Sequence, residues 1–377
     1  MSRAYLILAD GSVFEGQTIG TAGKTTGETV FTTGMTGYIE TLTDPSYYGQ
    51  IVTQTFPLIG NYGVEPPDFE SCKSHVRGYI VRELCGQPSN FRCEGSLDSF
   101  LKEQGIIGIS GIDTRALTKK LREAGVMNGM ILSGDKISEP AGKEKEKLLE
   151  EIRSFKIENA VASVQQDKFG MRNSEFGIRN KASTSADSKK IVLFDFGAKA
   201  NIQRELEKRC CQVTVVPYDT TAEKVISMNP DGIMLSNGPG DPAENTGVIS
   251  EIKKLCEYGK IPVFGICLGH QMLSLARGAK TSKLKYGHRG GNHPCKDLKT
   301  GRVYITSQNH GYAVETSSLP DNAELSFINL NDSTCEGITW KDIPAFSVQF
   351  HPEACGGPHD TNFLFDRFLK LMERQEK

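Results

Sequence analysis

One short segment constrains the second half of the chain more than any other: an apolar run that ends in Gly-Ile-Cys-Leu-Gly-His. The run covers residues 261–266, and an apolar-periodic stretch follows it as far as Ala276. A strand that passes directly into a helix at G-x-C-x-G predicts a sharp turn with Cys267 at its tip. Glycine suits positions 265 and 269, because a side chain there would collide with the neighbouring strand or helix. We expect Cys267 to project as a nucleophile, and a core cysteine packed between two glycines is the alternative.

The segments around this turn alternate between strands and helices. Continuous apolar runs, separated by helical stretches, occupy residues 191–194, 212–216, 232–235 and 261–266. This alternation predicts a parallel sheet covered on both faces, with its ligand site beyond the carboxyl ends of the strands. Three segments end strands in this way, at residues 196–197, 236–241 and 267–269.

The first 130 or so residues have a different composition, rich in Gly, Thr and β-branched residues. Short apolar runs such as residues 5–8 and 50–55 predict strands, with turn signals between them. A helix is predicted over Thr114–Ala124 and is closed by Gly125. The charged stretch at 136–156 predicts a solvated helix with one apolar face.

The domain organisation follows from these patterns. The small and polar stretch at 181–188 predicts an interdomain linker. We therefore expect an α/β protein with an N-terminal β-rich α/β domain at residues 1–180, ending in a linker near 181–190. A C-terminal domain with a mostly parallel sheet would occupy residues 190–377.

A cysteine nucleophile needs a base that is oriented by a third group. His351 follows a strand predicted over residues 345–350, and residues i and i+2 of an extended chain share a face. Glu353 should therefore point the same way as His351, where its carboxylate would fix the imidazole tautomer and stabilise the imidazolium. A strand-end histidine beside a solvated glutamate is the alternative.

The remaining histidines are weaker candidates for the base. His310, in the polar segment 307–311, is a competitor. His270 is on the same predicted helix as the turn and is expected to be a packing histidine. The others lie in polar stretches without strand context: His75, His288, His293 and His359.

The sequence also contains segments that could suggest a zinc site and a phosphate-binding loop. His351, Cys355 and His359 could suggest zinc, but the Gly and Pro residues between them prevent a helix that would align them, and no second cluster offers a fourth ligand. The segment 20–25 looks like a phosphate loop but has Thr18 where the motif requires Gly. We expect no metal and no ATP site on this chain. By contrast, the Gly- and Pro-rich loop 236–242 could expose backbone N–H groups to an oxyanion.

The composition limits the class of protein. The chain has 377 residues, a formal charge of -2 and ten cysteines, none of them spaced as C-x-x-C. A near-neutral charge offers no broad field for nucleic acid or anionic lipid. No signal peptide or membrane span is visible, so we expect a cytoplasmic protein with reduced thiols that binds neither nucleic acid nor membrane.

Four motifs in the second half occur together: GICLGHQ at 265–271, SNGPGDP at 236–242, SQNHGY at 307–312 and FHPE at 350–353. Together they resemble the class I (triad-type) glutamine amidotransferases. The resemblance implies that glutamine forms a thioester on Cys267, with His351 as the base and Glu353 as the orienting residue. Ammonia leaves, and water then releases glutamate.

Motifs in the first half of the chain point to a more specific family. The segments GETVFTTGMTGYIETLTDPSYYGQIV (27–52), PLIGNYG (57–63) and GIDTRALTKKLREAG (111–125) resemble the small subunit of carbamoyl-phosphate synthetase. In that family the small subunit delivers ammonia from L-glutamine to a large subunit, which makes carbamoyl phosphate from bicarbonate and ATP. The resemblance implies a heterodimer or higher oligomer with this partner, and a product for arginine synthesis, pyrimidine synthesis or both. ATP and Mg²⁺ would bind to the partner, with no cofactor on this chain.

The resemblance also implies a set of glutamine contacts, carried over by matching position. Their residues would be Ser46, Gly238, Gly240, Leu268, Gln271, Asn309, Gly311 and Tyr312. The N–H groups of Gly240 and Leu268 would form the oxyanion hole. Tyr312 often appears as Phe in relatives, a difference that keeps the ring.

Three rival functions can be compared with this one. The nearest is a class I amidotransferase subunit of another synthase, which the motifs of the first half disfavour. A non-catalytic scaffold is disfavoured by the intact Cys267, His351 and Glu353. A free cysteine hydrolase acting on peptides or esters is disfavoured by the glutamine contacts.

Overall fold

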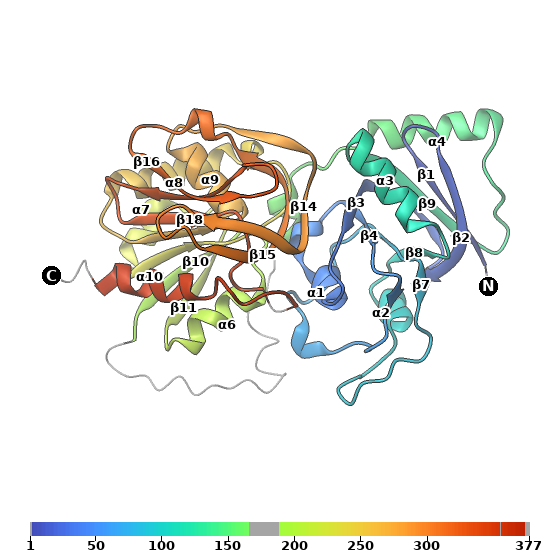
Figure 1. The fold of residues 1–377 in the computed structure, drawn as a ribbon, viewed down its shortest axis with the longest axis horizontal. Coiled ribbons are helices and arrows are strands. Elements are labelled where there is room, and N and C mark those ends of the chain that lie inside the picture. The colour runs from blue at the N-terminus through green and yellow to red at the C-terminus, as the bar shows by residue number, and fades with distance from the viewer. Residues whose placement is uncertain (1, 166–187, 355, 374–377) are drawn as a thin grey trace. The chain divides into compact units, whose positions relative to one another are not determined.

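The computed structural model describes residues 2–165, 188–354 and 356–373. The chain forms two compact units, Met1–Glu158 and Asn159–Lys377 (Figure 1). The short helix α5 (Ala160–Val164) belongs to the second unit, and its Val161 is buried in that unit's core. Most of the linker predicted near 181–190 lies outside the described residues, so that linker stays a prediction.

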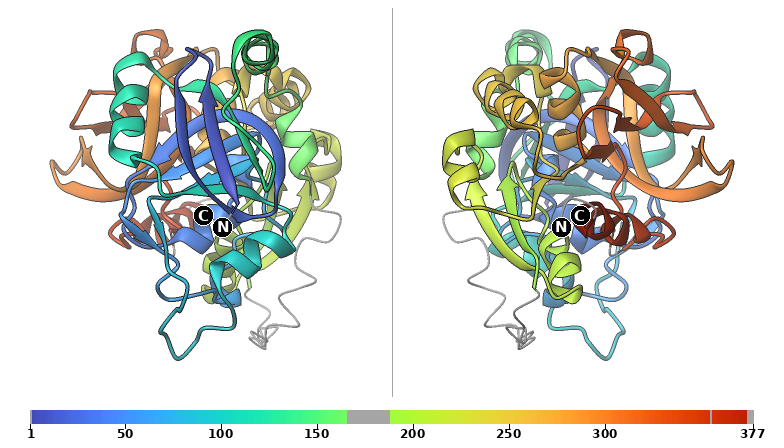
Figure 2. Two further views of the ribbon diagram at one scale, coloured as in Figure 1. Left: turned by 90° about the vertical axis from the view of Figure 1, so that its right-hand side faces the viewer. Right: turned by 90° about the vertical axis from the view of Figure 1, so that its left-hand side faces the viewer.

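The first unit is built on a closed β-barrel, seen from the barrel side in the left view of Figure 2. Its strands follow one another around the barrel in the order β1 (Arg3–Leu8), β2 (Val13–Gly20), β8 (Ile107–Ser110), β6 (Gly78–Ile80), β4 (Gln50–Gln54), β3 (Gly23–Thr32) and β9 (Met127–Gly134). The pairs β3–β4, β4–β6 and β6–β8 are parallel, and the other pairs are antiparallel. The expected β-rich α/β domain is therefore observed.

Successive side chains of β1 pack into two different hydrophobic clusters. Ala4, Leu6 and Leu8 belong to a buried cluster with apolar residues of β4, β6, β8 and β9 and with two leucines of helix α3 (Thr114–Ala124). Ile7 instead packs against helix α4 (Gly142–Ser154), as expected when successive side chains of a strand point to opposite faces. Two shorter helices, α1 (Tyr38–Thr43) and α2 (Leu97–Glu103), complete the unit with the two-stranded sheet of β5 (Leu58–Ile59) and β7 (Glu83–Leu84).

Helix α3 confirms its predicted bounds and shows how the sequence sets them. The side chain of Asp113 caps its first turn by accepting a hydrogen bond of 2.9 Å from the backbone N–H of Ala116. Gly125 ends the helix at a φ of 99°, a conformation that glycine adopts without strain.

The second unit contains a sheet in the order β11 (Gln212–Pro217), β10 (Lys190–Asp195), β12 (Gly232–Leu235), β13 (Val263–Ile266), β18 (Ala345–Val348), β17 (Cys335–Trp340), β16 (Ala323–Asn329), β14 (Thr281–Asp297) and β15 (Val303–Val314). Pairing is parallel from β11 to β18 and antiparallel from there to β15. The predicted parallel core is therefore present, and it continues into antiparallel strands. His288 and His293 lie on β14, although their polar surroundings gave no strand signal.

Helices cover both faces of the parallel strands (Figure 1, and the right view of Figure 2). One face packs on α7 (Ala222–Ser227), α8 (Thr246–Tyr258) and α9 (Leu268–Ala276), and the other on α6 (Ala200–Lys208) and α10 (Phe363–Glu373). Strand β10 supplies both cores, because Val192 and Phe194 face the first set while Ile191 and Leu193 face the second. Strands β10, β12, β13 and β18 are buried on both faces, which explains their continuous apolar runs, whereas the edge strand β11 is only partly buried.

Candidate active site

Cys267 lies at the tip of the predicted turn. It is the single residue between β13 and α9, it is 2% exposed, and its backbone has φ 52° and ψ -104°. A non-glycine residue rarely adopts this conformation, so the turn is strained. A Cβ atom on Gly269 would lie 2.3 Å from the carbonyl oxygen of Leu235, and one on Gly265 would lie 2.9 Å from the backbone of Gly269. The collision predicted from G-x-C-x-G is thus confirmed.

The surroundings of the turn bring several predicted residues together. The Cys267 thiol lies 3.7 Å from the backbone oxygen of Asn309 on β15. Leu268 begins α9, so its N–H belongs to the first turn, whose N–H groups have no partner within the helix. The next N–H, that of Gly269, donates to the carbonyl of Ser236 over 3.0 Å. This bond joins the nucleophile's helix to the loop 236–242.

His351 and Glu353 form a buried pair, with 2.6 Å between His351 Nδ1 and Glu353 Oε1 and no exposure of either side chain. The backbone N–H of His351 donates to Ser307 O over 2.9 Å. Among the residues that the structure describes, His351 Nε2 has no hydrogen-bond partner. The nitrogen opposite the carboxylate is therefore available for proton transfer.

Charges around this pair set its protonation. Burial and the Lys199 ammonium lower the pKa of His351, but Glu353 and Cys267 outweigh them and raise it to about 10. Burial raises the pKa of Glu353, but His351 and Lys199 lower it to about 2. Lys199 Nζ lies 3.5 Å from Glu353 Oε1. The pair therefore holds a proton on the imidazole and a negative charge on the carboxylate.

The competing histidines have other roles. His270 is fully buried, its Nδ1 lies 2.8 Å from Ser347 Oγ, and burial lowers its pKa to about 3. It is a packing histidine, as predicted. His310 has Nε2 at 2.6 Å from Gln308 Oε1 and Nδ1 at 2.7 Å from the backbone oxygen of Tyr312. Both of its nitrogens are engaged, so it is a poorer base than His351.

The loop 236–242 is fixed against the end of β10. The Asn237 side chain accepts from Lys199 N over 3.0 Å and donates to Gly197 O over 3.1 Å. A Cβ on Gly238 would lie 2.2 Å from Phe196 O, and Gly240 has a φ of +87°. The structure thus requires glycine at the first of these positions and favours it at the second, where glutamine contacts are predicted.

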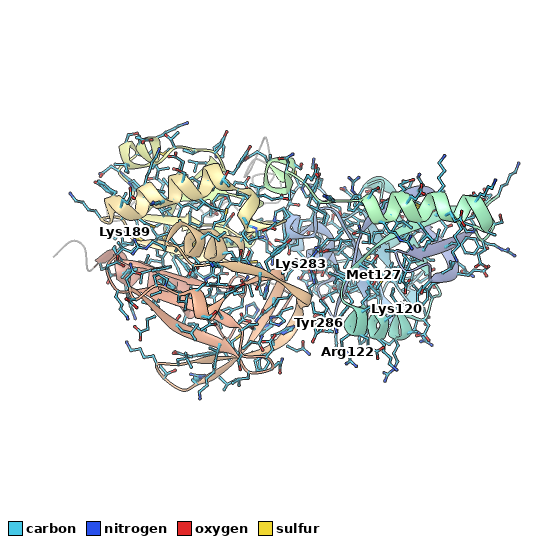
Figure 3. All side chains as sticks on the ribbon, turned by 90° about the horizontal axis from the view of Figure 1, so that it is seen from above. Lys120, Arg122, Met127, Lys189, Lys283 and Tyr286 are labelled. Atoms are coloured by element: carbon cyan, nitrogen blue, oxygen red, sulfur yellow. The ribbon has the colours of Figure 1, made fainter. Side chains whose placement is uncertain are left out.

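The predicted contacts from β15 also gather at this end of the sheet. Gln271 Nε2 donates to Tyr312 O over 2.7 Å and to Gln349 Oε1 over 2.8 Å, which ties α9 to the strand that carries Asn309 and Gly311. The Tyr312 ring has the Lys283 ammonium 6.0 Å from its centroid, and Lys283 is labelled on β14 in Figure 3.

Ser46, the remaining predicted glutamine contact, lies in the first unit. It occupies the 3-10 helix Pro45–Tyr47, where its N–H donates to Asp44 Oδ1 over 2.9 Å. This bond fixes the backbone at Ser46, and the role of Ser46 in binding glutamine stays a prediction.

One group of metal-ligand type was not predicted: His288, His310 and Glu336, whose ligand atoms lie within 4.8 Å of one another. Hydrogen bonds already engage it, among them 2.8 Å from His288 Nε2 to Asp332 and 3.0 Å from Gln308 Nε2 to Glu336. Burial lowers the pKa of His288, but Asp332 and Glu336 raise it to about 9. This group is a charged hydrogen-bond network. In the zinc alternative, Cys355 lies outside the described residues and His351 Nδ1 is engaged by Glu353.

Two residues near the pair were missed from the sequence, Lys199 and Asn201. They follow the carboxyl end of β10, where a parallel sheet places its ligand site. The segment 196–197 was recognised as such a strand end, and extending the search by one helical turn would have included both residues.

Known protein families match both halves of the chain. The family model "Glutamine amidotransferase class-I" matches residues 192–371, and "Carbamoyl-phosphate synthase small chain, CPSase domain" matches residues 6–131. A carbamoyl phosphate synthase small chain from Listeria monocytogenes serotype 4b is 51% identical over 378 residues, covering 100% of this chain and 99% of that protein. The chain belongs to the carbamoyl phosphate synthase small chain family.

Other members of this family are similar over the same extent. The small chain from Clostridium perfringens is 50% identical over 368 residues, covering 98% of this chain and 99% of its own. Among solved structures, a glutamine amidotransferase from Thermotoga maritima covers 50% of this chain and 85% of its own, with 16% identity and a TM-score of 0.37. In the described part of the chain, no helix is both long and apolar enough to cross a membrane.

Proposed function

We propose that this chain is the glutamine-hydrolysing small subunit of a carbamoyl-phosphate synthetase. It would convert L-glutamine to glutamate and ammonia, and the ammonia would pass to a large subunit that makes carbamoyl phosphate from bicarbonate and ATP. The observation that carries the proposal is the buried His351–Glu353 pair, 2.6 Å apart, with Cys267 close enough to raise the pKa of the imidazole. Cys267 lies on a strained strand-to-helix turn in a member of this family.

The reaction begins with attack of the Cys267 sulfur on the side-chain carbonyl carbon of glutamine. His351 holds the thiol's proton, and Glu353 stabilises the imidazolium. The oxyanion that forms is stabilised by the N–H groups of Leu268 and Gly240. The C–N bond then breaks, and His351 gives its proton to the departing ammonia.

Hydrolysis of the thioester repeats these roles with water. His351 takes a proton from water, whose oxygen attacks the thioester carbonyl. The C–S bond breaks, glutamate leaves and the proton returns to Cys267. No cofactor takes part, and ATP and Mg²⁺ are assigned to the large partner protein.

Besides Gly240 and Leu268, the glutamine contacts of the proposal come from Ser46, Gly238, Gln271, Asn309, Gly311 and Tyr312. They are supported by matching motif positions and, for those in the second unit, by the packing of α9, β15 and loop 236–242 against one another. We also place the enzyme in the cytoplasm, in keeping with the described cysteines, all of which are free of disulfides.

The test is glutamate release from glutamine by this chain, alone and with a large synthetase subunit in the presence of ATP and bicarbonate. We expect release to rise with the partner and to match the carbamoyl phosphate formed. Release that no such partner raises would favour an amidotransferase of another synthase. No release in either setting would refute the hydrolase itself.

A further inference from the structure

Two consecutive backbone carbonyls follow His351, those of Pro352 and Glu353, and neither belongs to a strand. Strand β18 ends at Val348, and both residues are buried. A buried carbonyl without a partner is costly, so its hydrogen bond determines how such a segment is held. Here each carbonyl is bonded by the side-chain amide of an asparagine.

The first asparagine, Asn201, lies in the first turn of α6. Its Nδ2 donates to the backbone oxygen of Glu353, and the residue is 6% exposed. The helix begins immediately after Lys199, whose ammonium lies 3.5 Å from the Glu353 carboxylate. The start of α6 thus contacts the backbone and the side chain of the same glutamate.

The second asparagine, Asn362, immediately precedes α10. Its Nδ2 donates to Pro352 O over 3.3 Å and to Glu205 Oε2 over 3.0 Å, while its Oδ1 accepts from Arg209 Nη2 over 2.7 Å. Arg209 Nη1 also donates to Glu205 Oε2 over 2.8 Å. Glu205 and Arg209 therefore orient Asn362 from α6 and the residue that follows it.

We propose that Asn201 and Asn362, together the carbonyl clamp, are positioning residues for hydrolysis of glutamine. They hold the backbone at 352–353 so that the Glu353 carboxylate stays against His351 Nδ1. The polar contacts of the carboxylate are on one oxygen: Oε1 meets His351 Nδ1 and Lys199 Nζ, whereas Oε2 has no hydrogen-bond partner among the described residues. The inference rests on the proposed function, and neither asparagine is assigned a contact with glutamine.

A purely structural clamp would behave differently from a positioning one. If it only joins α6 and α10 to the sheet, removing it lowers the unfolding temperature without changing turnover by the folded protein. If it positions Glu353, turnover falls in folded protein while the KM for glutamine stays close to wild type, because the glutamine contacts lie elsewhere. A displacement of about 1 Å at a catalytic group can cost roughly 100-fold in rate.

The experiment compares Asn201→Ala, Asn362→Ala and the double variant with wild type, each assembled with the large subunit. We expect kcat for glutamate release to fall about tenfold in each single variant, with KM within about twofold and ammonia-dependent synthesis unchanged. The double variant should lose less than the product of the single losses, because both bonds hold one segment. The control is Asn322→Ala, whose Nδ2 donates to exposed Asp342 over 3.0 Å.

Different outcomes refute the proposed function and the carbonyl clamp. Wild-type complex that releases no glutamate overturns the proposed function. Wild-type activity with unchanged kcat in both folded single variants overturns the clamp. If Asn201→Ala does not fold, the half-buried Asn362 decides the matter, and unchanged kcat in Asn362→Ala refutes the clamp by itself.

Discussion

His351 Nδ1 and Glu353 Oε1 lie 2.6 Å apart in a place where neither side chain is exposed. Away from water, each charge is stabilised mainly by the other, which is why the pKa of the imidazole is raised to about 10 and that of the carboxyl is lowered to about 2. The two residues are only two positions apart, and they meet in a turn beyond the end of β18 at Val348.

Replacing Glu353 with Gln keeps the shape of the side chain and removes its charge. Burial and Lys199 would then dominate, so we expect the pKa of His351 to fall from about 10 and kcat for glutamate release to drop by about 100-fold or more. NMR titration of His351 and steady-state assays measure the two effects. Glu65→Gln, a change at a carboxylate that is 2% exposed in the first unit, is the control. A variant with unchanged kcat would remove Glu353 from the mechanism.

Replacing Cys267 with Ala should abolish the glutamine-dependent activity of the complex and leave the ammonia-dependent activity unchanged. Glutamine-dependent carbamoyl phosphate formation should disappear, because no other group can form the thioester. Synthesis from added ammonia should continue, because in the proposed function that step uses only sites on the large subunit. Assays with glutamine and with ammonium chloride make the comparison, and loss of both activities in a well-folded complex would contradict the proposed division of labour.

The charged network around His288 should make the second unit less stable in alkali. A pKa raised to about 9 in the folded state gives a stabilisation that is complete below the unfolded value of about 6.5 and is lost as pH rises through 9. We expect a loss on the order of 3 kcal/mol in unfolding free energy between these limits. Trp340, the one tryptophan of the chain, is buried on β17 and reports urea unfolding of this unit.

The matched variant for this titration is His288→Asn. It should show a smaller alkaline loss between pH 6.5 and 9, while the part due to His351 persists toward pH 10. Equal slopes in variant and wild type would show that His288 is not charged in the folded protein.

The glycine at 269 should be far less replaceable than one on a neighbouring helix. The added Cβ of Gly269→Ala would lie 2.3 Å from Leu235 O, and backbone cannot easily move away, so we expect destabilisation by about 1–3 kcal/mol and loss of glutaminase activity. Gly247 on α8 has nothing within 4 Å of the place that a Cβ would occupy, so Gly247→Ala should be neutral or stabilise by about 0.5–1 kcal/mol. Thermal unfolding of both variants provides the comparison.

The sequence predicted the parts of the fold that have strong local signals. The helix Thr114–Ala124 and the strand Gly232–Leu235 have the bounds that were predicted, because caps and apolar runs define them. Strand β14 was missed because its residues are largely polar and irregular in burial, so the two-residue period is absent. Its pairing with β15 is set by contacts distant in sequence, which local patterns do not encode.

In the candidate site, too, residues with local sequence signals were predicted and residues that act through distant contacts were not. Cys267, His351 and Glu353 were found because motif spacing fixes their geometry on one turn or one strand end. The asparagines that hold the backbone after His351 come from positions 201 and 362, and each carries a residue type common at helix starts. Only the folded arrangement reveals that both reach the same loop.

The strained backbone of Cys267 presents the sulfur for reaction, and the same strain lowers the stability of the folded protein. At φ 52° and ψ -104°, a side chain is tolerated only because the surrounding glycines and strands leave the chain no alternative. A glycine in its place would relieve the strain and remove the sulfur, giving a protein that lasts longer and does nothing with glutamine. Selection for heat resistance alone would therefore favour loss of the nucleophile, because the backbone conformation that presents the sulfur also costs stability.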